Sequence, residues 1–167
     1  MFKMTLAAFL FASACAHDSK EKEIFRQFPK HFLATQSIRV ATKNGQDVLL
    51  AKLSRNNQDI KVVFLEPLFS QAILTQESTT KGITTKWHKE IALPFDASQI
   101  MNLIRAIYMH ERYMLKDDYY FLDLPDAKIS FSQVAAPCAF PKKMEVDFKA
   151  NPSVKLSITT EDVACPS

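Results

Sequence analysis

The residues with reactive side chains are few in this 167-residue chain, and their spacing limits the chemistry they support. The four histidines are His17, His31, His88 and His110, and none has the partner four residues away that places two imidazoles on one helix face for zinc. The only two glycines lie far apart, which excludes a Gly-x-Ser-x-Gly elbow and a phosphate-binding glycine loop. We expect no enzymatic activity, metal or cofactor; a hydrolase assembled from distant residues is the alternative.

The composition is that of an ordinary globular protein. Hydrophobic side chains make up 47% of the chain and charged side chains 23%, which excludes a wholly disordered or collagen-like protein. The formal net charge of +3 is spread without a dominant basic block, so we expect no nucleic-acid partner. The length predicts one domain.

The first of the three cysteines, Cys15, follows a segment typical of bacterial export signals. Lys3 supplies a positive charge, residues 4–11 are almost wholly apolar, and residues 12–14 are small. The apolar run is too short to span a membrane, which takes about 20 apolar residues. Small residues directly before a cysteine resemble a lipobox, the signal for lipoprotein processing.

The lipobox resemblance implies that residues 1–14 are a lipoprotein signal peptide and that Cys15 becomes the acylated first residue of the mature chain. Residues 15–23 then form the acylated cysteine and a polar tether, and residues 24–167 form a single domain. Several acyl chains anchor durably, because each buried CH₂ contributes about 0.8 kcal/mol. Ala16, where an aspartate would direct retention, favours the periplasmic face of the outer membrane. Plain secretion with cleavage after Ala14 or Ala16 is the alternative.

Cys138 and Cys165 are the two cysteines left once Cys15 is acylated. Export places them in an oxidising compartment, and their even number predicts a single disulfide. Neither has the Cys-x-x-Cys spacing or the neighbouring base that would indicate a reactive thiol.

Strands are the elements that must position these residues. Short β-rich runs with brief connections predict an antiparallel meander in the first half of the domain and further strands near its end. The first set is residues 36–42, 47–54, 59–66, 72–78 and 82–88. The second set is residues 119–123, 128–132, 144–148 and 154–160. Before both, the apolar spacing in residues 21–32 predicts a short helix.

One amphipathic helix is predicted between the two sets of strands. Asp96 stands at an N-cap position with Gln99 three residues later, as in a capping box. Apolar side chains then follow at helical spacing and form one stripe that must dock on a sheet. The stripe consists of Ile100, Leu103, Ile104, Ile107 and Tyr108. The fold class predicted is α+β, with a curled antiparallel sheet packed on this central helix.

Residues 48–53 and 60–65 are apolar on both strand faces and therefore need cover on the second face as well. This cover could be another sheet, a helix inside a curved sheet, or a ligand. Between the curled sheet and the helix we expect an apolar cavity that binds an acyl or other hydrophobic chain. The candidate lining and mouth residues are Val62, Phe64, Leu65, Leu68, Phe69, Ile100, Leu103 and Ile107. Ordinary core packing is the alternative for each of them.

The stretch from Val48 to Glu111 also resembles a known family. The segments that carry the resemblance are residues 49–51, 63–71, 93–94 and 104–108. They are similar to small bacterial outer-membrane lipoproteins found with aryl-polyene and fatty-acid-like biosynthesis genes. That family is similar in fold to the lipoprotein carriers LolA and LolB, in which a half-open β-barrel closed by helices surrounds an apolar cavity. The family's usual glycine near residues 70–71 is absent here.

The resemblance implies a lipid-anchored protein that binds or transfers a hydrophobic chain at the periplasmic face of the outer membrane. The cargo classes implied are an acyl chain, a polyene lipid or a lipoprotein. It also implies that Leu68 and Phe69 correspond to the protruding apolar loop of LolB-type receptors. A structural lipoprotein that scaffolds an envelope assembly without a ligand is the alternative function.

We expect the Cys15→Ala variant to lose its attachment to membranes, because an alanine carries no acyl chain. Cell fractionation followed by high-salt washing of the membrane pellet measures this. The wild-type protein should stay in the washed pellet and the variant should appear in the soluble fraction. A variant that still sediments with washed membranes would contradict lipid anchoring.

Overall fold

The computed structural model describes residues 22–25, 28–68, 70–89, 96–116, 119–135, 138 and 140–166. The expected signal peptide, Cys15, most of the expected tether and Phe69 lie outside these residues.

Eleven strands and one helix make up the described part of the chain. The strands before the helix are β1 (Lys22–Phe25), β2 (His31–Thr42), β3 (Gly45–Asn56), β4 (Asp59–Leu65), β5 (Ala72–Thr79) and β6 (Gly82–Trp87). The helix is α1 (Ala97–Tyr108). The strands after it are β7 (Arg112–Lys116), β8 (Tyr119–Asp123), β9 (Ala127–Ala135), β10 (Phe140–Phe148) and β11 (Lys155–Ala164).

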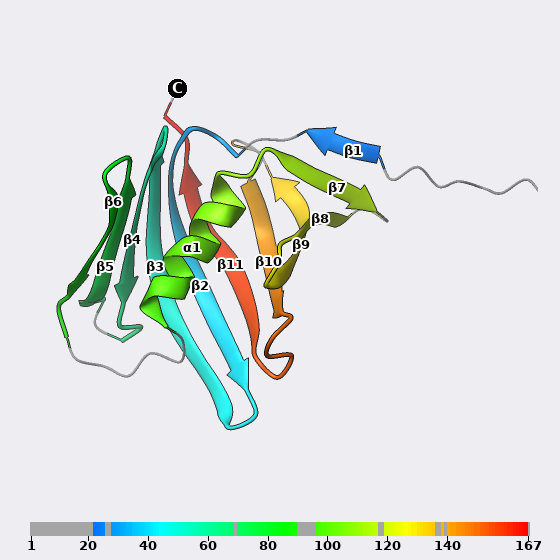
Figure 1. Cartoon of the computed structure of the whole chain (residues 1–167). Helices are drawn as coiled ribbons and strands as arrows, with labels where there is room; N and C mark the ends of the chain where they lie inside the picture. The colour runs from blue at the N-terminus through cyan, green and yellow to red at the C-terminus, as the bar shows by residue number, and fades with distance from the viewer. Residues whose placement is uncertain are drawn as a thin grey trace, which may run out of the picture.

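All eleven strands belong to one antiparallel sheet, in the order β1-β7-β8-β9-β10-β11-β2-β3-β4-β5-β6 (Figure 1). Short connections make consecutive strands pair within two meanders, β2 to β6 and β7 to β11. The pairing of β11 with β2 joins the meanders. The sheet stays open, with β1 and β6 as its edges.

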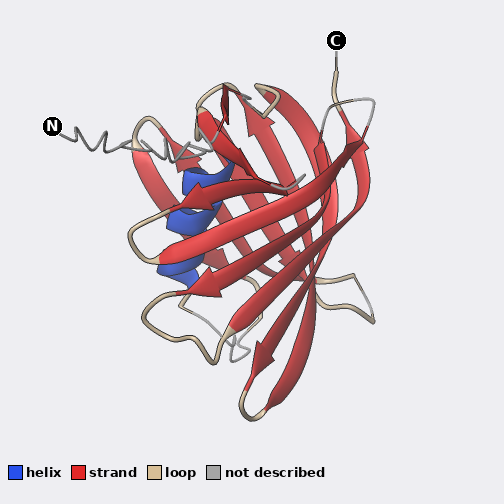
Figure 2. Ribbon diagram, turned by 90° about the vertical axis from the view of Figure 1, so that its right-hand side faces the viewer, coloured by secondary structure: helices blue, strands red, loops and turns tan. Residues whose placement is uncertain are grey.

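Helix α1 lies against the concave side of the sheet, and the strands curve around it (Figure 2). It begins directly after Asp96, whose carbonyl accepts hydrogen bonds from the backbone N–H groups of Gln99 and Ile100. The predicted apolar stripe faces the sheet, since Ile100, Ile104 and Ile107 are all buried. The predicted curled antiparallel sheet on a central helix is therefore confirmed. No helix within the described residues has the length and apolar character needed to cross a membrane.

The core lies between α1 and the concave face. Every second residue from Phe32 to Val40 in β2 is buried, and the inward positions of β3 and β4 follow the same alternation. One end of this core is aromatic, where the ring of Phe28 lies 4.9 Å from Tyr108 and 5.4 Å from Phe140, both edge-on. One continuous cluster of buried side chains thus joins the helix to both meanders.

The structure corrects the start of the domain. Residues 21–32, predicted as a short helix, contain β1 and the beginning of β2, and β1 starts inside the segment expected as a tether. Two non-local contacts override the helical spacing: β1 pairs with β7, and Phe32 packs at 4.9 Å from Phe140. The sequence did not predict β7.

Of the covers expected for the double-faced strands, the structure shows the helix inside a curved sheet. Among the described elements, only α1 packs on the sheet, and it covers one face (Figure 2). On the other face Leu65 is buried, Leu50 and Val63 are half-buried and Val48 is exposed. Exposed apolar side chains are ordinary on a protein surface and need no second layer.

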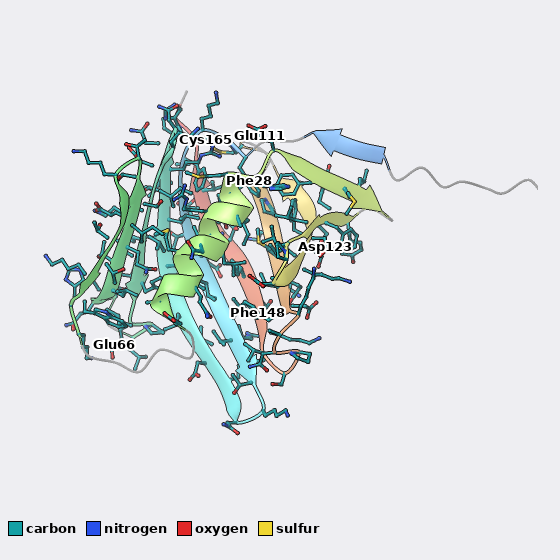
Figure 3. The ribbon with its side chains drawn as sticks, in the orientation of Figure 1. Phe28, Glu66, Glu111, Asp123, Phe148 and Cys165 are labelled. Carbon is teal, nitrogen blue, oxygen red and sulfur yellow. A yellow bond between two sulfur atoms is a disulfide. The ribbon has the colours of Figure 1, made fainter. Side chains whose placement is uncertain are left out.

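Cys138 and Cys165 form a disulfide, as predicted, with their Cα atoms 5.9 Å apart. Cys138 precedes β10 and Cys165 follows β11, so the bond holds the C-terminal end of the described chain to the sheet. Cys165 lies at the same end of the sheet as Phe28 and Glu111 (Figure 3).

Replacing both Cys138 and Cys165 by alanine should lower the free energy of unfolding by roughly 3–4 kcal/mol, because the 27-residue separation is then no longer closed in the unfolded chain. Urea unfolding followed by circular dichroism measures the change. Dithiothreitol should destabilise the wild-type protein by a similar amount and leave the double variant unaffected. Equal stability of the oxidised wild type and the variant would contradict the prediction.

Candidate functional site

The candidate site is a small cavity of about 20 Å³ between α1 and the concave face. Its sheet side, called the floor below, comes from β2, β3, β4 and β11. The floor consists of Gln36, Ile38, Ala51, Leu53, Val62, Leu156 and Ile158. From α1 the lining residues are Ile100, Leu103, Ile104, Ile107 and Tyr108. Almost all of these side chains are aliphatic, so the cavity is an apolar one.

The size of the cavity decides what the closed molecule accommodates. A buried water needs roughly 10–15 Å³, whereas an apolar cavity that admits benzene is about 150 Å³. At about 20 Å³ the cavity takes no more than a water-sized body. A space thus lies where the sequence predicted a cavity, but the prediction of room for a hydrophobic chain is wrong for the closed molecule, because the protein's own side chains nearly fill it. A hydrophobic chain enters only if α1 moves away from the floor.

Four of the eight residues predicted as lining or mouth surround this cavity. Val62 contributes from β4, and Ile100, Leu103 and Ile107 contribute from α1. Helical and strand periodicity identified them correctly as inward-facing. Their part in binding a ligand stays a prediction.

The other predicted residues lie elsewhere. Phe64 is fully buried in the core but does not line the cavity. Leu65 is buried outside the core cluster, and strand alternation places it on the other face of the sheet from Phe64. Leu68 is 84% exposed in the turn after β4, away from the cavity lining, and Phe69 is outside the described residues.

Sequence analysis missed Ala51 and Leu53 of β3 and all of the floor supplied by β2 and β11. Gln36 and Ile38 belong to β2, and Leu156 and Ile158 belong to β11. The alternating apolar residues of both strands were a usable signal for a buried face. Their position beside each other under α1 depends on the pairing of β11 with β2, which no local pattern specifies.

A buried hydrogen-bond chain crosses the floor beneath the C-terminal end of α1. The amide nitrogen of Gln36 donates to the hydroxyl oxygen of Tyr108 at 2.8 Å and to that of Thr160 at 3.4 Å. The Thr160 hydroxyl donates in turn to the carbonyl oxygen of Pro141 at 2.8 Å. Because a buried polar group without a partner is costly, these bonds let Gln36 and Tyr108 lie in an otherwise apolar interior.

Side chains from the sheet also hold the last carbonyl groups of α1. Arg55 of β3 donates to the carbonyl oxygen of Tyr108, and the hydroxyl of Tyr113 in β7 donates to that of Ile107 at 2.6 Å. Helix C-termini carry partial negative charge and unpaired carbonyls, so a guanidinium and a phenol are well matched to this end. At the opposite end, the amide nitrogen of Gln76 in β5 donates to the carbonyl oxygen of Ala97 at 2.6 Å.

The described residues offer no sign of a metal centre. They contain no group of three or more His, Cys, Asp and Glu side chains placed to hold a metal ion. Two of the histidines make other contacts: the ring of His88 lies 2.9 Å from the hydroxyl oxygen of Thr75, and that of His110 packs against Tyr113. His17 lies outside the described residues.

Comparison with known proteins identifies a known fold that this chain resembles. No protein-family model matches the chain, and no curated protein matches it either. Among solved structures, a LolA superfamily protein from Nitrosomonas europaea is similar over 84% of this chain and 89% of its own, with a TM-score of 0.52 and 11% identity. The chain has a LolA-like fold. At this identity the similarity concerns the fold alone, and the resemblance to aryl-polyene-associated lipoproteins stays a prediction.

The buried phenols of the LolA-like fold predict how its stability depends on pH. Burial raises the pKa of Tyr108 and of Tyr113 above the ordinary value of 10, and the hydrogen bond from Gln36 opposes this only in part for Tyr108. Both groups therefore favour folding fully below pH 10. Their contribution is lost as the pH rises from 10 through their higher folded pKa values, because only the unfolded chain releases the two protons.

We expect alkaline titration to show two of the four tyrosines ionising together with unfolding. Absorbance at 295 nm reports phenolate, and far-ultraviolet circular dichroism reports the fold. In a Tyr108→Phe, Tyr113→Phe double variant the unfolding transition should no longer coincide with a phenolate step. Full ionisation of all four tyrosines of the wild type while the fold persists would contradict the burial argument.

Proposed function

We propose that the protein is a lipid-anchored, non-enzymatic carrier or receptor that binds a hydrophobic chain between the floor and α1. One observation carries the proposal: the concave face of a LolA-like fold is aliphatic, and a single 12-residue helix covers it with a matching apolar stripe. An alkyl chain can replace the helix side chains on the floor without exposing the floor to water. Such an exchange avoids the cost of about 25 cal/mol for each Å² of apolar surface exposed.

The attachment of α1 supports an opening that keeps one end in place. Its C-terminal end is bonded to Arg55 and Tyr113, and the Tyr108 side chain is bonded to Gln36. A neutral hydrogen bond contributes about 0.5–1.5 kcal/mol and one to a charged group about 1.5–3 kcal/mol. At the N-terminal end, a neutral bond from Gln76 joins the sheet to the carbonyl oxygen of Ala97. We therefore propose that α1 pivots at its C-terminal end and lifts at its N-terminal end.

The anchor and location belong to the same proposal. Acylation at Cys15 would hold the domain at the periplasmic face of the outer membrane, where acyl chains, polyene lipids and lipoproteins are the cargo classes that fit an apolar floor. The turn after β4 supports a receptor role, because Leu68 projects a large apolar side chain into solvent. In this turn Ser70 adopts a positive φ of 53°, a conformation that glycine takes more readily.

A scaffolding lipoprotein is less well supported. Such a protein is expected to present a contiguous apolar patch to its partners. In the described structure the large exposed apolar side chains are spread over β2, β3, the turn after β4, β6 and β8. They are Leu33, Val48, Leu68, Ile83, Trp87 and Tyr119.

Filling the cavity should weaken binding of a hydrophobic chain. Ala51 is 1% exposed and lines the cavity, so Ala51→Val adds two carbons to the space that the chain would occupy. We expect the affinity for an environment-sensitive fluorescent acyl probe to fall by about tenfold or more, as a one-methylene misfit in an apolar pocket does. Titration of the wild-type protein and the variant by fluorescence measures the change.

Ala34→Val is the matched control. Ala34 is also 1% exposed and lies in a neighbouring strand, but it does not line the cavity. Urea unfolding of both variants corrects the affinities for any unfolded fraction. Failure of the wild-type protein to bind the probe, or equal affinities of the two variants, would contradict the proposed function.

A further inference from the structure

Strands β5 and β6 lie at one edge of the sheet (Figure 1). Polar and apolar side chains share their inner face. In the antiparallel register, Gln76 pairs with Thr85, Ser78 with Ile83, and Leu74 with Trp87. Paired residues lie on the same face of a sheet. The bond from Gln76 to α1 shows that this face is the one that the helix covers.

Two buried polar atoms on this face have no partner. Gln76 is 0% exposed and Ser78 1%, yet neither the side-chain carbonyl oxygen Oε1 of Gln76 nor the hydroxyl oxygen of Ser78 has a hydrogen-bond partner in the described structure. Buried polar groups without a partner are rare in native proteins, and each one calls for an explanation.

The orientation of the Gln76 amide is fixed by its nitrogen. Nε2 donates one bond to the carbonyl oxygen of Ala97 at 2.6 Å and one to the hydroxyl oxygen of Thr85 at 3.2 Å. Rotating the amide by 180° would bring its own carbonyl oxygen against that of Ala97, which cannot donate. Oε1 is therefore an acceptor held in place without a donor.

The face of the sheet around this acceptor is uncharged. Every residue that the register places on this face of β4, β5 and β6 is neutral. They are Ile60, Val62, Phe64, Leu74, Gln76, Ser78, Ile83, Thr85 and Trp87. Arg55 pairs with Ile60 at the margin, but its guanidinium already donates to backbone carbonyls. A charged head group buried against these strands would find no counter-ion on them, whereas a neutral donor could bond to Oε1 of Gln76.

We propose that Gln76, Ser78, Ile83 and Trp87 form a subsite for the polar end of the bound chain, and that this end is a neutral hydrogen-bond donor such as an amide N–H or a hydroxyl. The donor bonds to Oε1 of Gln76, and the Ser78 hydroxyl serves as a second partner. This inference rests on the proposed function, because it requires a hydrophobic chain beneath α1. It adds the chemical class of the head group.

The position of the subsite agrees with the way α1 is attached. The bond between Gln76 and Ala97 holds the N-terminal end of the helix, which is the end proposed to lift. Lifting that end uncovers Gln76 in β5, next to the edge strand β6. Ile83 and Trp87 are already 40% and 48% exposed there, so an entering chain meets apolar side chains first.

Trp87 makes the test direct, since it is the only tryptophan in the chain and its fluorescence reports occupancy of the subsite. The full chain is titrated with decanamide and with methyl decanoate. The two probes share the chain length and a carbonyl group, but only the amide has N–H donors. We expect the wild-type protein to bind decanamide about five- to tenfold more tightly, which corresponds to one neutral hydrogen bond.

Gln76→Met keeps the length of the side chain and removes Oε1, so the preference for the amide should fall to about one. The Gln76→Met variant also loses the bond to Ala97. That loss should change the affinities for decanamide and for methyl decanoate by the same factor, so their ratio is unaffected. Ala34→Val is the matched control, because it changes a buried side chain of the sheet that does not line the cavity. That variant should keep the wild-type preference.

The outcomes separate the two proposals. If neither probe binds the wild-type protein, both the proposed function and the subsite are wrong. Equal wild-type affinities, or a preference that persists in Gln76→Met, overturn the subsite alone. Should circular dichroism show that Gln76→Met does not fold, N,N-dimethyldecanamide decides with the wild-type protein. This amide lacks an N–H group and should bind as weakly as the ester, and binding as tight as that of decanamide overturns the subsite.

Discussion

The structure depends on covering one concave apolar face. A single curved sheet cannot bury its own inner side, and in the described chain α1 supplies the cover. The helix meets this requirement with one apolar stripe, so most of its stability comes from the floor and little from its 12-residue length. The same surface that stabilises the closed molecule is the surface that a hydrophobic chain would use. Stability and binding are therefore in direct competition.

Buried polar groups under α1 determine which end of the helix a bound chain would displace. Gln36 lies under one end of α1 with its amide nitrogen bonded to Tyr108, whereas Gln76 lies under the other end with its carbonyl oxygen unpaired. In the closed state, the hydrogen bonds of the buried glutamine under the C-terminal end of the helix are thus better satisfied than those of the glutamine under the N-terminal end. This asymmetry gives a physical reason for the direction in which α1 opens and for the class of head group that is preferred. Both follow from the side chain of Gln76.

Local patterns in the sequence predicted part of this structure. Alternation and turn residues placed β2 to β6, and capping with a stripe placed α1, because these features depend on neighbours in sequence. The even cysteine count predicted the bond between Cys138 and Cys165. Local patterns did not reveal β1 pairing with β7, or β11 beside β2, because long-range packing decides those contacts. Of the seven floor residues only Val62 was therefore predicted, and Leu65, predicted to line the cavity or its mouth, lies on the other face of β4.

The central claim is that α1 is a separable cover over a floor that accepts a chain. Amide hydrogen exchange, resolved by peptide, tests it most directly in the presence and absence of saturating decanamide. The account predicts that amides in α1 exchange well before those of β2 and β3, and that ligand alters exchange in α1 and in β5 to β6 while the aromatic end of the core stays unchanged. Exchange of α1 only together with β2 and β3, unaffected by the ligand, would contradict it.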